Sequence, residues 1–136
     1  DLSELGSYAR VENSAYRMLK RNTPGSFTFV FPATKEVPRR LVHPQKKTIG
    51  LRVPEHAAAM GLLGAMGEPL LSTTLKLPDF HEDEAMLRDP EDIAAALDKR
   101  VAVVLGCGAG SDDVSTIVDF TADEPRITRQ GAGELR

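Results

Sequence analysis

The sequence predicts an α/β or mixed α+β domain, because about six strand-like segments are interleaved with about four helix-like segments. In the helix-like segments apolar residues recur at helical spacing, whereas the strand-like segments alternate small and aromatic residues or are rich in Val and Ile. The chain has 136 residues. That length is enough for a single domain (1–136), which buries roughly two thirds of the surface of the unfolded chain.

The N-terminal segment predicts an amphipathic helix that runs to about Lys20. Asp1 and Glu4 have the spacing of a capping box, in which each side chain satisfies a free amide of the first turn. One apolar stripe follows at helical spacing, made of Val11, Ala15, Met18 and Leu19. Because most proteins begin with a few loose residues, a start on a helix cap leads us to expect further sequence upstream of Asp1.

Two strands and a basic connector are expected next. Residues 26–31 alternate Phe with other residues, which is typical of a strand that carries its Phe side chains on one face. Residues 32–47 are rich in Pro, Lys and Arg and predict a connector. Residues 48–53 predict a second strand, which Pro54 stops because proline suits the first position of a helix.

The middle of the chain predicts a buried helix. It is expected from Glu55 to about Met66, because Ala, Leu and Met cover most of its circumference, and Gly67 is placed to cap it. Residues 70–75 predict a third strand, and residues 78–88 predict an acidic loop.

The C-terminal part predicts one more helix and three more strands. Asp89 is a helix cap with Pro90 in the first turn, and the acids that follow lie against the positive end of the helix dipole. Ile93 and Leu97 are then expected to face the core. The remaining segments are strands at 101–105, 115–120 and 126–130, and a glycine-rich loop at 106–113.

Composition excludes several classes of protein. The single cysteine, Cys107, excludes a disulfide framework, and His43, His56 and His81 lack the spacing of a zinc site. No apolar run approaches the ~18 residues of a membrane span, and the first residues do not resemble a signal peptide. We therefore expect a soluble, cytoplasmic protein.

The net charge of −3 conceals two opposed blocks. Residues 35–52 hold six cations and one anion, a net charge of +5, whereas residues 79–98 hold eight anions and one cation, a net charge of −7. The cations considered for phosphate or RNA binding are Lys35, Arg39, Arg40, Lys46 and Lys47. Because no aromatic residues are interleaved with them, such binding would be directed at the nucleic-acid backbone and sensitive to salt. A solvated basic loop is the alternative.

Three other candidate sites have plain structural alternatives. The loop Gly106–Ser111 follows a strand but precedes another strand, so it lacks the helix N-terminus of a phosphate-binding loop and also fits a flexible connector. Cys107 has no His or acid beside it in the sequence, which favours a small loop residue over a nucleophile. Glu82, Asp83 and Glu84 fit either a hard-cation site or a solvated loop, and the metal requirement stays open.

Hydroxyl groups and arginines recur on strand faces. Thr48, Gly50 and Arg52 share one face of their strand, since alternate residues of a strand point to the same side. Other hydroxyl residues and one more arginine lie on or near the ends of other predicted strands: Ser72, Thr74, Ser115 and Arg129. An arginine with several hydroxyls can hold a carboxylate or a phosphate, although ordinary strand residues are the alternative.

Four motifs in order and spacing resemble the YrdC/YciO family of threonylcarbamoyl-AMP synthases. They lie at residues 48–54 (TIGLRVP), 67–74 (GEPLLSTT), 115–119 (STIVD) and 129–131 (RQG). Residues 22–29 and 34–40 look especially like the YciO branch. The resemblance covers nearly the whole chain and implies a twisted mixed β-sheet flanked by helices.

The resemblance also implies an activity and a set of site residues. Family enzymes condense L-threonine, bicarbonate and ATP, with Mg²⁺, into threonylcarbamoyl-AMP and pyrophosphate for the modification of adenosine beside the tRNA anticodon. By position, the threonine would be held by Arg52, Ser72 and Ser115, and ATP would be contacted by Thr48, Thr74 and Arg129. Such a site works by positioning and charge neutralisation, so no residue is expected to act as a nucleophile.

Two departures from the family pattern stand out. The family's Pro-Thr-Asp-type segment and Lys-x-Arg motif would lie before Asp1, so the chain is expected to hold the C-terminal two thirds of the family domain. The synthase motif Ser-Thr-Ser-Ala-Asn reads STTLK at residues 72–76, which places the cation of Lys76 where the family has an amide. The rival hypothesis is a module that binds double-stranded RNA or tRNA through the basic block and has no synthase activity.

Overall fold

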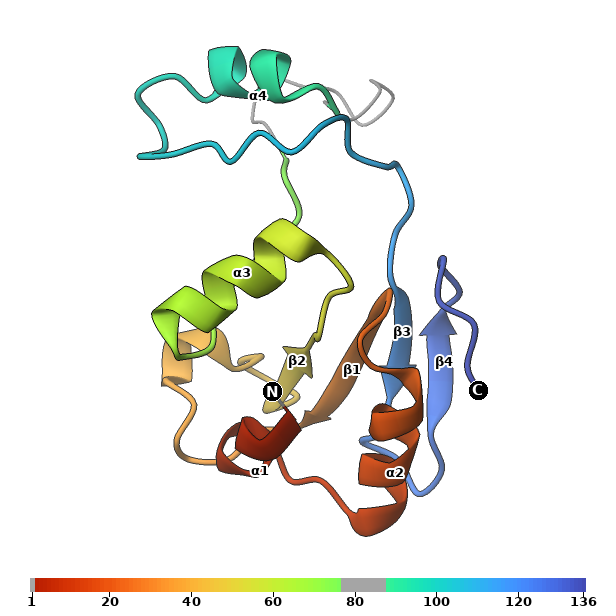
Figure 1. Ribbon diagram of the computed structural model, residues 1–136. Helices are drawn as coiled ribbons and strands as arrows, with labels where there is room; N and C mark the ends of the chain where they lie inside the picture. The colour runs from red at the N-terminus through yellow and green to blue at the C-terminus, as the bar shows by residue number, and fades with distance from the viewer. Residues whose placement is uncertain (1, 77–87) are drawn as a thin grey trace. The chain divides into compact units, whose positions relative to one another are not determined.

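The computed structural model describes residues 2–76 and 88–136 (Figure 1). The chain divides into two compact units, which are described separately below. The first unit contains Asp1–Glu55 and Asp113–Arg136, and the second contains His56–Asp112. No helix among the described residues is long and apolar enough to cross a membrane.

The first unit is built on a mixed sheet with the strand order β2-β1-β3-β4. The central strand β1 pairs antiparallel with β2 and parallel with β3, and β3 pairs antiparallel with β4. The strands are β1 (Phe27–Pro32), β2 (Thr48–Leu51), β3 (Thr116–Asp119) and β4 (Arg126–Arg129). Four strands predicted from the sequence are therefore confirmed, and so is the mixed sheet with helices.

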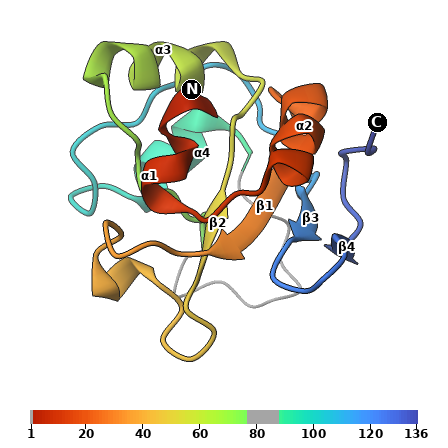
Figure 2. The same ribbon diagram turned by 90° about the horizontal axis from the view of Figure 1, so that it is seen from below.

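The hydrophobic core lies on one face of this sheet. Phe27, Phe29 and Phe31 are all buried, as their alternation along β1 predicted. They pack with Val118 of β3 and with Leu19 of helix α2 (Asn13–Asn22). Figures 1 and 2 show that α2 and the short helix α1 (Leu5–Tyr8) lie on the same side of β1. The opposite face of the sheet is left for polar groups.

The N-terminal helix is not continuous, which corrects the prediction of a single helix to about Lys20. A 3-10 turn, η1 (Leu2–Glu4), leads into α1, and the chain is extended before α2 begins. The break arises because the backbone pairs with the connector after β1: Ala9 bridges Ala33, and the Arg10 N–H donates to the Pro32 carbonyl at 3.0 Å. The capping box falls outside the described residues, since it involves the first residue of the chain.

The connector between β1 and β2 ends in a tight turn. It contains one 3-10 turn, η2 (Arg39–Leu41). At its end the His43 N–H donates to the Thr48 carbonyl at 3.0 Å, and the Lys47 N–H donates to the His43 carbonyl at 2.9 Å. Lys47 has the left-handed φ of 55° that this turn requires. The strand that follows ends at Leu51, two residues earlier than predicted.

The second unit contains two helices whose ends follow local sequence signals. Helix α3 (Ala57–Met66) ends at Gly67, which has a φ of 68° and donates its N–H to the Leu63 carbonyl at 3.0 Å. Helix α4 (Pro90–Ala96) begins where the Asp89 carboxylate accepts the Glu91 N–H at 2.8 Å. Both caps were predicted from the sequence and are confirmed.

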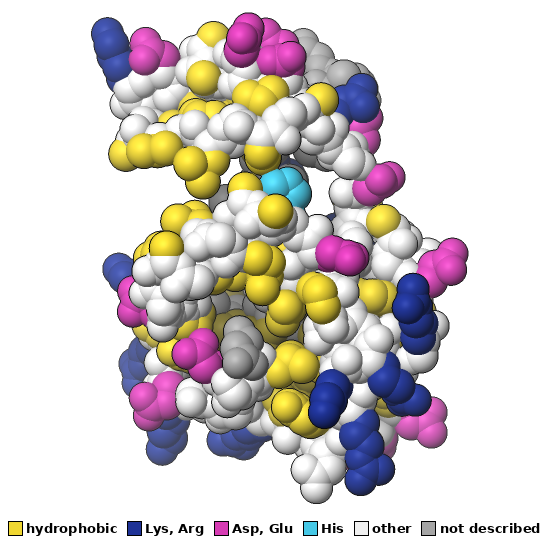
Figure 3. All heavy atoms as spheres, viewed as in Figure 1, with side chains coloured by type: hydrophobic (Ala, Val, Ile, Leu, Met, Phe, Trp, Pro, Cys, Tyr) yellow, Lys and Arg dark blue, Asp and Glu magenta, His cyan; other side chains and the backbone are white. Residues whose placement is uncertain are grey.

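The apolar segments of the second unit are more exposed than predicted. No residue of α3 is buried among the residues that the structure describes, which contradicts the expected burial of this helix. No strand forms over 70–75 or 101–105, because a strand needs a hydrogen-bonded neighbour and the described residues of this unit supply none. Leu71, Val103 and Leu105 are 76%, 70% and 57% exposed, and Figure 3 shows apolar side chains on the surface near α4. The predicted acidic loop at 78–88 lies outside the described residues except for Arg88.

Candidate functional site

Polar side chains gather on the face of the sheet opposite the core, which we call the polar face. Because β1 places Phe27, Phe29 and Phe31 in the core, the residues between them point to the other side. The strand register sets Thr28 beside Ile117, and sets Val30 between Gly50 and Asp119. The polar residues on this face are Thr28, Thr48, Ser115, Asp119, Thr128 and Arg129.

One end of the polar face holds a hydrogen-bonded cluster around Ser115. The Ser115 hydroxyl lies 2.7 Å from the Thr28 hydroxyl and accepts from Arg129 Nη2 at 3.0 Å. The Ser115 carbonyl accepts from Arg129 Nε at 3.0 Å and from Nη2 at 2.8 Å. The guanidinium therefore fixes both the backbone and the side chain of Ser115. When Thr28 donates to Ser115, the proton of the serine hydroxyl is available to a ligand.

The structure thus brings together two residues that the sequence singled out, Ser115 and Arg129, and adds Thr28. The hydroxyl of Thr28 could have been found with the same face-sharing argument that paired Thr48 with Arg52. It is the polar member of an alternating run whose other face is Phe, and such a residue must point away from the core.

Arg52 and Thr48 lie at opposite ends of β2. Arg52 is exposed and follows the last residue of β2, whose pairing with β1 ends at Leu51 beside Phe29. Thr48 pairs with Pro32, which lies four residues beyond Thr28 in β1. This is a separation of roughly 13 Å along the strand. Thr48 therefore lies at a different part of the polar face from Thr28 and the Ser115 cluster.

A hollow of about 500 Å³ is lined in part by Thr48, and we call it the Thr48 hollow. Among the described residues that line it, Val30 is the apolar one. The polar lining residues are His43, Lys46, Thr48, Asp119, Thr121 and Thr128. Lys46, which the sequence offered as a candidate for RNA binding, is therefore also part of a small concave site.

Asp119 supplies a negative charge to the Thr48 hollow. Burial raises the pKa of Asp119, but hydrogen bonds from the Thr121 hydroxyl and N–H, with the charges of Arg126 and Lys46, outweigh it and lower the pKa below its ordinary value. The two bonds from Thr121 both reach Oδ1, at 2.6 and 2.8 Å. Among the described residues, Oδ2 accepts no hydrogen bond, so it remains an acceptor for a ligand.

His43 holds the turn that carries Lys46. Its Nδ1 accepts the backbone N–H groups of Gln45, at 3.3 Å, and of Lys46, at 3.1 Å. Because Nδ1 acts as an acceptor, the proton of the neutral ring is assigned to Nε2, which makes that atom a donor. Nothing in the spacing of the sequence indicated this role of His43.

Ser72 and Thr74 belong to the second unit. Both are exposed and lie with Lys76 in an irregular segment, where the sequence predicted a strand. Their proposed contacts with threonine and ATP stay predictions.

Cys107 has a histidine neighbour that the sequence did not predict. Its Sγ lies 3.8 Å from Nε2 of His56, in the second unit. The two residues are far apart in the chain, so the sequence neighbourhood of the cysteine, which contains no His, could not reveal this contact. Both side chains are exposed.

The described residues contain no cluster that could hold a metal by itself. No group of three or more His, Cys, Asp or Glu side chains comes together among them. The acidic candidates Glu82, Asp83 and Glu84 lie outside the described residues.

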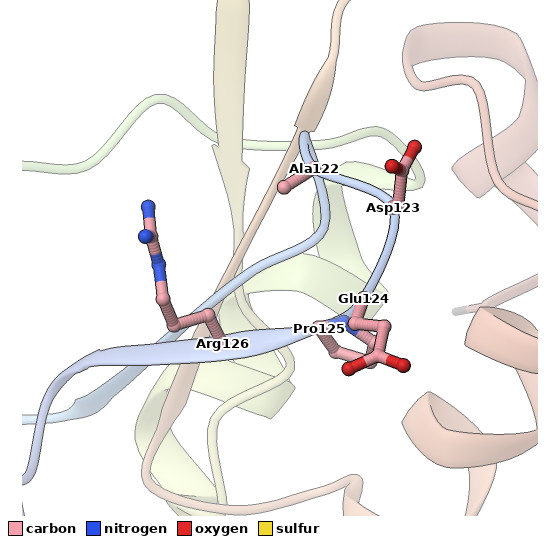
Figure 4. Close-up of a pocket in the computed structure, with 5 residues that line it drawn as sticks. All are labelled: Ala122, Asp123, Glu124, Pro125 and Arg126. Carbon is pink, nitrogen blue, oxygen red and sulfur yellow. The ribbon is translucent and has the colours of Figure 1, made fainter.

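A second hollow, of about 560 Å³, is lined by the turn between β3 and β4. Figure 4 shows Arg126 extending away from Asp123 and Glu124 there, and no predicted site residue lines it.

Comparison with known proteins identifies the family. The model of the Sua5/YciO/YrdC family, described as "Telomere recombination", matches residues 1–131. The chain belongs to this family. An uncharacterized protein of Haemophilus influenzae is 49% identical over 98% of the chain, and the uncharacterized YciO of Escherichia coli K12 is 46% identical over 100%. A threonylcarbamoyl-AMP synthase of Klebsiella pneumoniae is 31% identical over 90%.

The chain covers only part of the length of each of these relatives. The chain spans 63%, 65% and 61% of these three proteins, respectively. The crystal structure of E. coli YciO matches with a TM-score of 0.86 over 98% of this chain and 64% of that one. Pyrococcus abyssi Sua5 complexed with L-threonine matches with a TM-score of 0.78 over 96% and 38%, at 22% identity, which shows a shared fold.

Proposed function

We propose that the chain is part of a threonylcarbamoyl-AMP synthase-like enzyme, which converts L-threonine, bicarbonate and ATP into threonylcarbamoyl-AMP and pyrophosphate for tRNA modification. The observation that carries the proposal is the cluster of Thr28, Ser115 and Arg129 at one end of the polar face. A serine hydroxyl fixed by an arginine and a second hydroxyl is suited to hold a small polar substrate in one orientation. The identity to the Klebsiella synthase supports the same conclusion.

We assign the roles of the site residues from their positions on the polar face and from the family resemblance. The exposed guanidinium of Arg52, just after β2, would pair with the carboxylate of threonine, and the Ser115 hydroxyl would bond to the same substrate. Arg129 would contact ATP. Thr48 would also contact ATP, and the roles that the resemblance implies for Ser72 and Thr74, in the second unit, stay predictions. Catalysis would then rest on positioning and charge neutralisation.

Mg²⁺ fits this proposal as a partner of the nucleotide rather than of a protein cage. Mg²⁺ commonly binds through one or two carboxylates together with the phosphates of the substrate. Asp119 lines the same hollow as Thr48, and its pKa is lowered, so it is a protein group suited to such an ion. In this arrangement the ion neutralises phosphate charge.

The direct test measures pyrophosphate release by the protein in its full natural length. Pyrophosphate release that requires both threonine and bicarbonate supports the synthase. Release that is independent of either substrate refutes it. Arg52→Ala should abolish the dependence on threonine, because it removes the proposed carboxylate partner. Lys35→Ala is the matched control, since it removes an exposed cation of the same basic block without touching the polar face.

RNA binding without synthase activity is the second candidate function. It is favoured by the exposure of Lys35, Arg39, Arg40, Lys46 and Lys47, which all belong to the connector between β1 and β2. If about five phosphates are neutralised, the logarithm of the affinity for a double-stranded RNA should fall with the logarithm of salt concentration at a slope of roughly −4. A flat dependence between low and physiological salt rejects this candidate, and Arg39→Ala with Arg40→Ala should weaken binding while leaving threonine dependence unchanged.

A further inference from the structure

The hydroxyl of Thr116 ties the segment that follows β4 to the first residue of β3. Thr116 is fully buried, and its hydroxyl donates to the Gly133 carbonyl at 2.6 Å. The same oxygen accepts the Gly131 N–H at 2.9 Å and the Nε2 amide of Gln130 at 3.4 Å. A hydroxyl has one proton and two lone pairs, so these contacts use its whole hydrogen-bonding capacity. We call this set of contacts the Thr116 clamp.

The clamp begins where the backbone pairing of β3 and β4 ends. The last pair of this ladder is Ile117 with Arg129, and the register shifts beside it, between Ile117 and Val118. Such an irregularity disrupts the ladder locally, so the ladder alone restrains Arg129 weakly. Beyond this pair, the side chain of Thr116 accepts the Gly131 N–H. The backbone of Arg129 is therefore held by the ladder before it and by the clamp two residues after it.

Two glycines bring the clamped segment close enough for one hydroxyl to reach both of its ends. A Cβ added at Gly131 would collide with the Val114 carbonyl oxygen, and a Cβ added at Gly133 would lie 2.6 Å from the Ser26 carbonyl oxygen. The segment can approach the neighbouring backbone this closely because glycine has no side chain. The Gly131 N–H and the Gly133 carbonyl thus both come within hydrogen-bonding distance of Thr116.

The side chain of Arg129 extends from this fixed backbone to Ser115. Its three hydrogen bonds to Ser115 use Nε and Nη2. Nη1 takes part in none of these three bonds, so it can donate to an anionic group of a ligand. Thr116 is also the next residue after Ser115 in the chain. One buried residue therefore restrains both partners, Ser115 through the peptide bond and Arg129 through the clamp.

We propose that Thr116 is a positioning residue of the Ser115 cluster: its hydroxyl fixes the backbone after Arg129 and so holds the guanidinium on Ser115, with Nη1 left to donate to an anionic ligand. Thr116 itself is buried and does not touch the ligand. The placement of Arg129 is a property of the fold, whereas its consequence for ATP rests on the proposed function. Neither the sequence motifs nor the resemblance assigned a role to Thr116.

The test measures the exchange of the Arg129 Nε–H with solvent by ¹H–¹⁵N NMR, in the protein of full natural length. The signal is assigned by its loss in Arg129→Lys. Thr116→Val keeps the β-branched shape and removes the hydroxyl. It should speed the exchange about tenfold, because the clamp no longer opposes the local opening that releases the guanidinium. Thr116→Ser keeps a hydroxyl and should exchange within about threefold of the wild type. Unchanged exchange in Thr116→Val, or equally fast exchange in Thr116→Ser, would overturn the proposal.

Thr23→Val is the matched control for a general loss of stability. The Thr23 hydroxyl donates to the Leu19 carbonyl at 2.8 Å, at the end of α2, which packs on the core side of the sheet. The variant removes the same chemical group far from the Ser115 cluster, so the Arg129 Nε–H should exchange within about twofold of the wild type. Equal acceleration in Thr23→Val and Thr116→Val would mean a general loosening of the fold and would overturn the proposal.

Gln130→Ala decides the question if Thr116→Val does not fold. The side chain of Gln130 is exposed, so its removal leaves the core intact. It eliminates the Nε2 group that donates to the Gly133 carbonyl at 3.0 Å and contacts the Thr116 hydroxyl. Faster exchange of the Arg129 Nε–H in this variant supports the clamp, and unchanged exchange overturns it.

Enzyme kinetics distinguish a positioning role from a purely structural one. Thr116→Val should raise the KM for ATP about tenfold, because a displacement of about 1 Å is enough to weaken the contacts of an oriented group. Thr23→Val should leave this KM within about twofold, and Thr116→Ser should restore it. Faster exchange with an unchanged KM in an active enzyme would overturn the positioning role. Absence of threonine-dependent pyrophosphate release in the wild type would refute the proposed function alone, since the exchange measurement still tests the placement of Arg129.

Discussion

The hydrogen bond between Thr28 and Ser115 provides the sharpest test of the polar face. Thr28→Val removes the hydroxyl that lies 2.7 Å from Ser115 Oγ and keeps the β-branched shape of the side chain. The Ser115 hydroxyl retains its bond from Arg129 Nη2, so no buried polar atom is orphaned. The cost is then that of one hydrogen bond between neutral groups, about 1 kcal/mol, which corresponds to a fall in Tm of about 3–5 °C.

A double-mutant cycle isolates this contact from the effects of the individual side chains. The variants are Thr28→Val, Ser115→Ala and the pair, with unfolding followed in urea and L-threonine binding followed by calorimetry. We expect a coupling energy of about 1 kcal/mol between the two positions, because each single change already breaks the shared bond. Thr28→Ser keeps a hydroxyl at the same position and should restore most of the threonine affinity. Strict additivity of the two changes, in stability and in binding alike, would refute the orienting role of Thr28.

Three further predictions concern the same sheet. Phe29→Ala should destabilise the fold by about 3–5 kcal/mol in urea unfolding, because Phe29 is 1% exposed and stacks on Phe27 with ring centroids 5.5 Å apart; a loss below about 1 kcal/mol would contradict its place in the core. Gly131→Ala should destabilise by about 1–3 kcal/mol in the same assay, because a Cβ there meets the backbone carbonyl of Val114, and a neutral result would reject this close approach. Asp119 has a lowered pKa in the folded state, so its contribution to stability is present above the unfolded pKa of about 3.9 and is lost as pH falls through the folded pKa. Asp119→Asn should flatten the acid limb of a plot of stability against pH, and an unchanged acid limb would show that Asp119 does not contribute.

The elements that the sequence predicted correctly are those that local chemistry determines. The alternation of Phe along 27–31 requires only that one face of a strand be buried, and the core bears this out. Gly67 and Asp89 mark helix ends because each satisfies backbone groups within a few residues of itself. Such signals do not depend on what the rest of the chain does.

The wrong predictions all depend on residues that are distant in the sequence. The segments 70–75 and 101–105 have strand composition, but composition does not supply the neighbouring strand that must accept their hydrogen bonds. The first helix breaks because Ala9 pairs with a residue beyond β1. The contact between Cys107 and His56 likewise joins positions that no local pattern relates.

Strand direction explains which of the predicted hydroxyls and arginines meet. Ser115 immediately precedes β3, and Thr28 lies near the start of β1. Because these two strands are parallel, with Phe27 beside Thr116, the beginnings of both lie at the same end of the sheet and the two hydroxyls come within hydrogen-bonding distance. The antiparallel partner β2 runs the other way, so its first residue, Thr48, lies at the opposite end, beside the last residues of β1. If β3 ran antiparallel to β1, Ser115 would instead lie at the Thr48 end. The division of the polar face into a Ser115 cluster and a Thr48 hollow therefore follows from topology, which the sequence motifs alone do not contain.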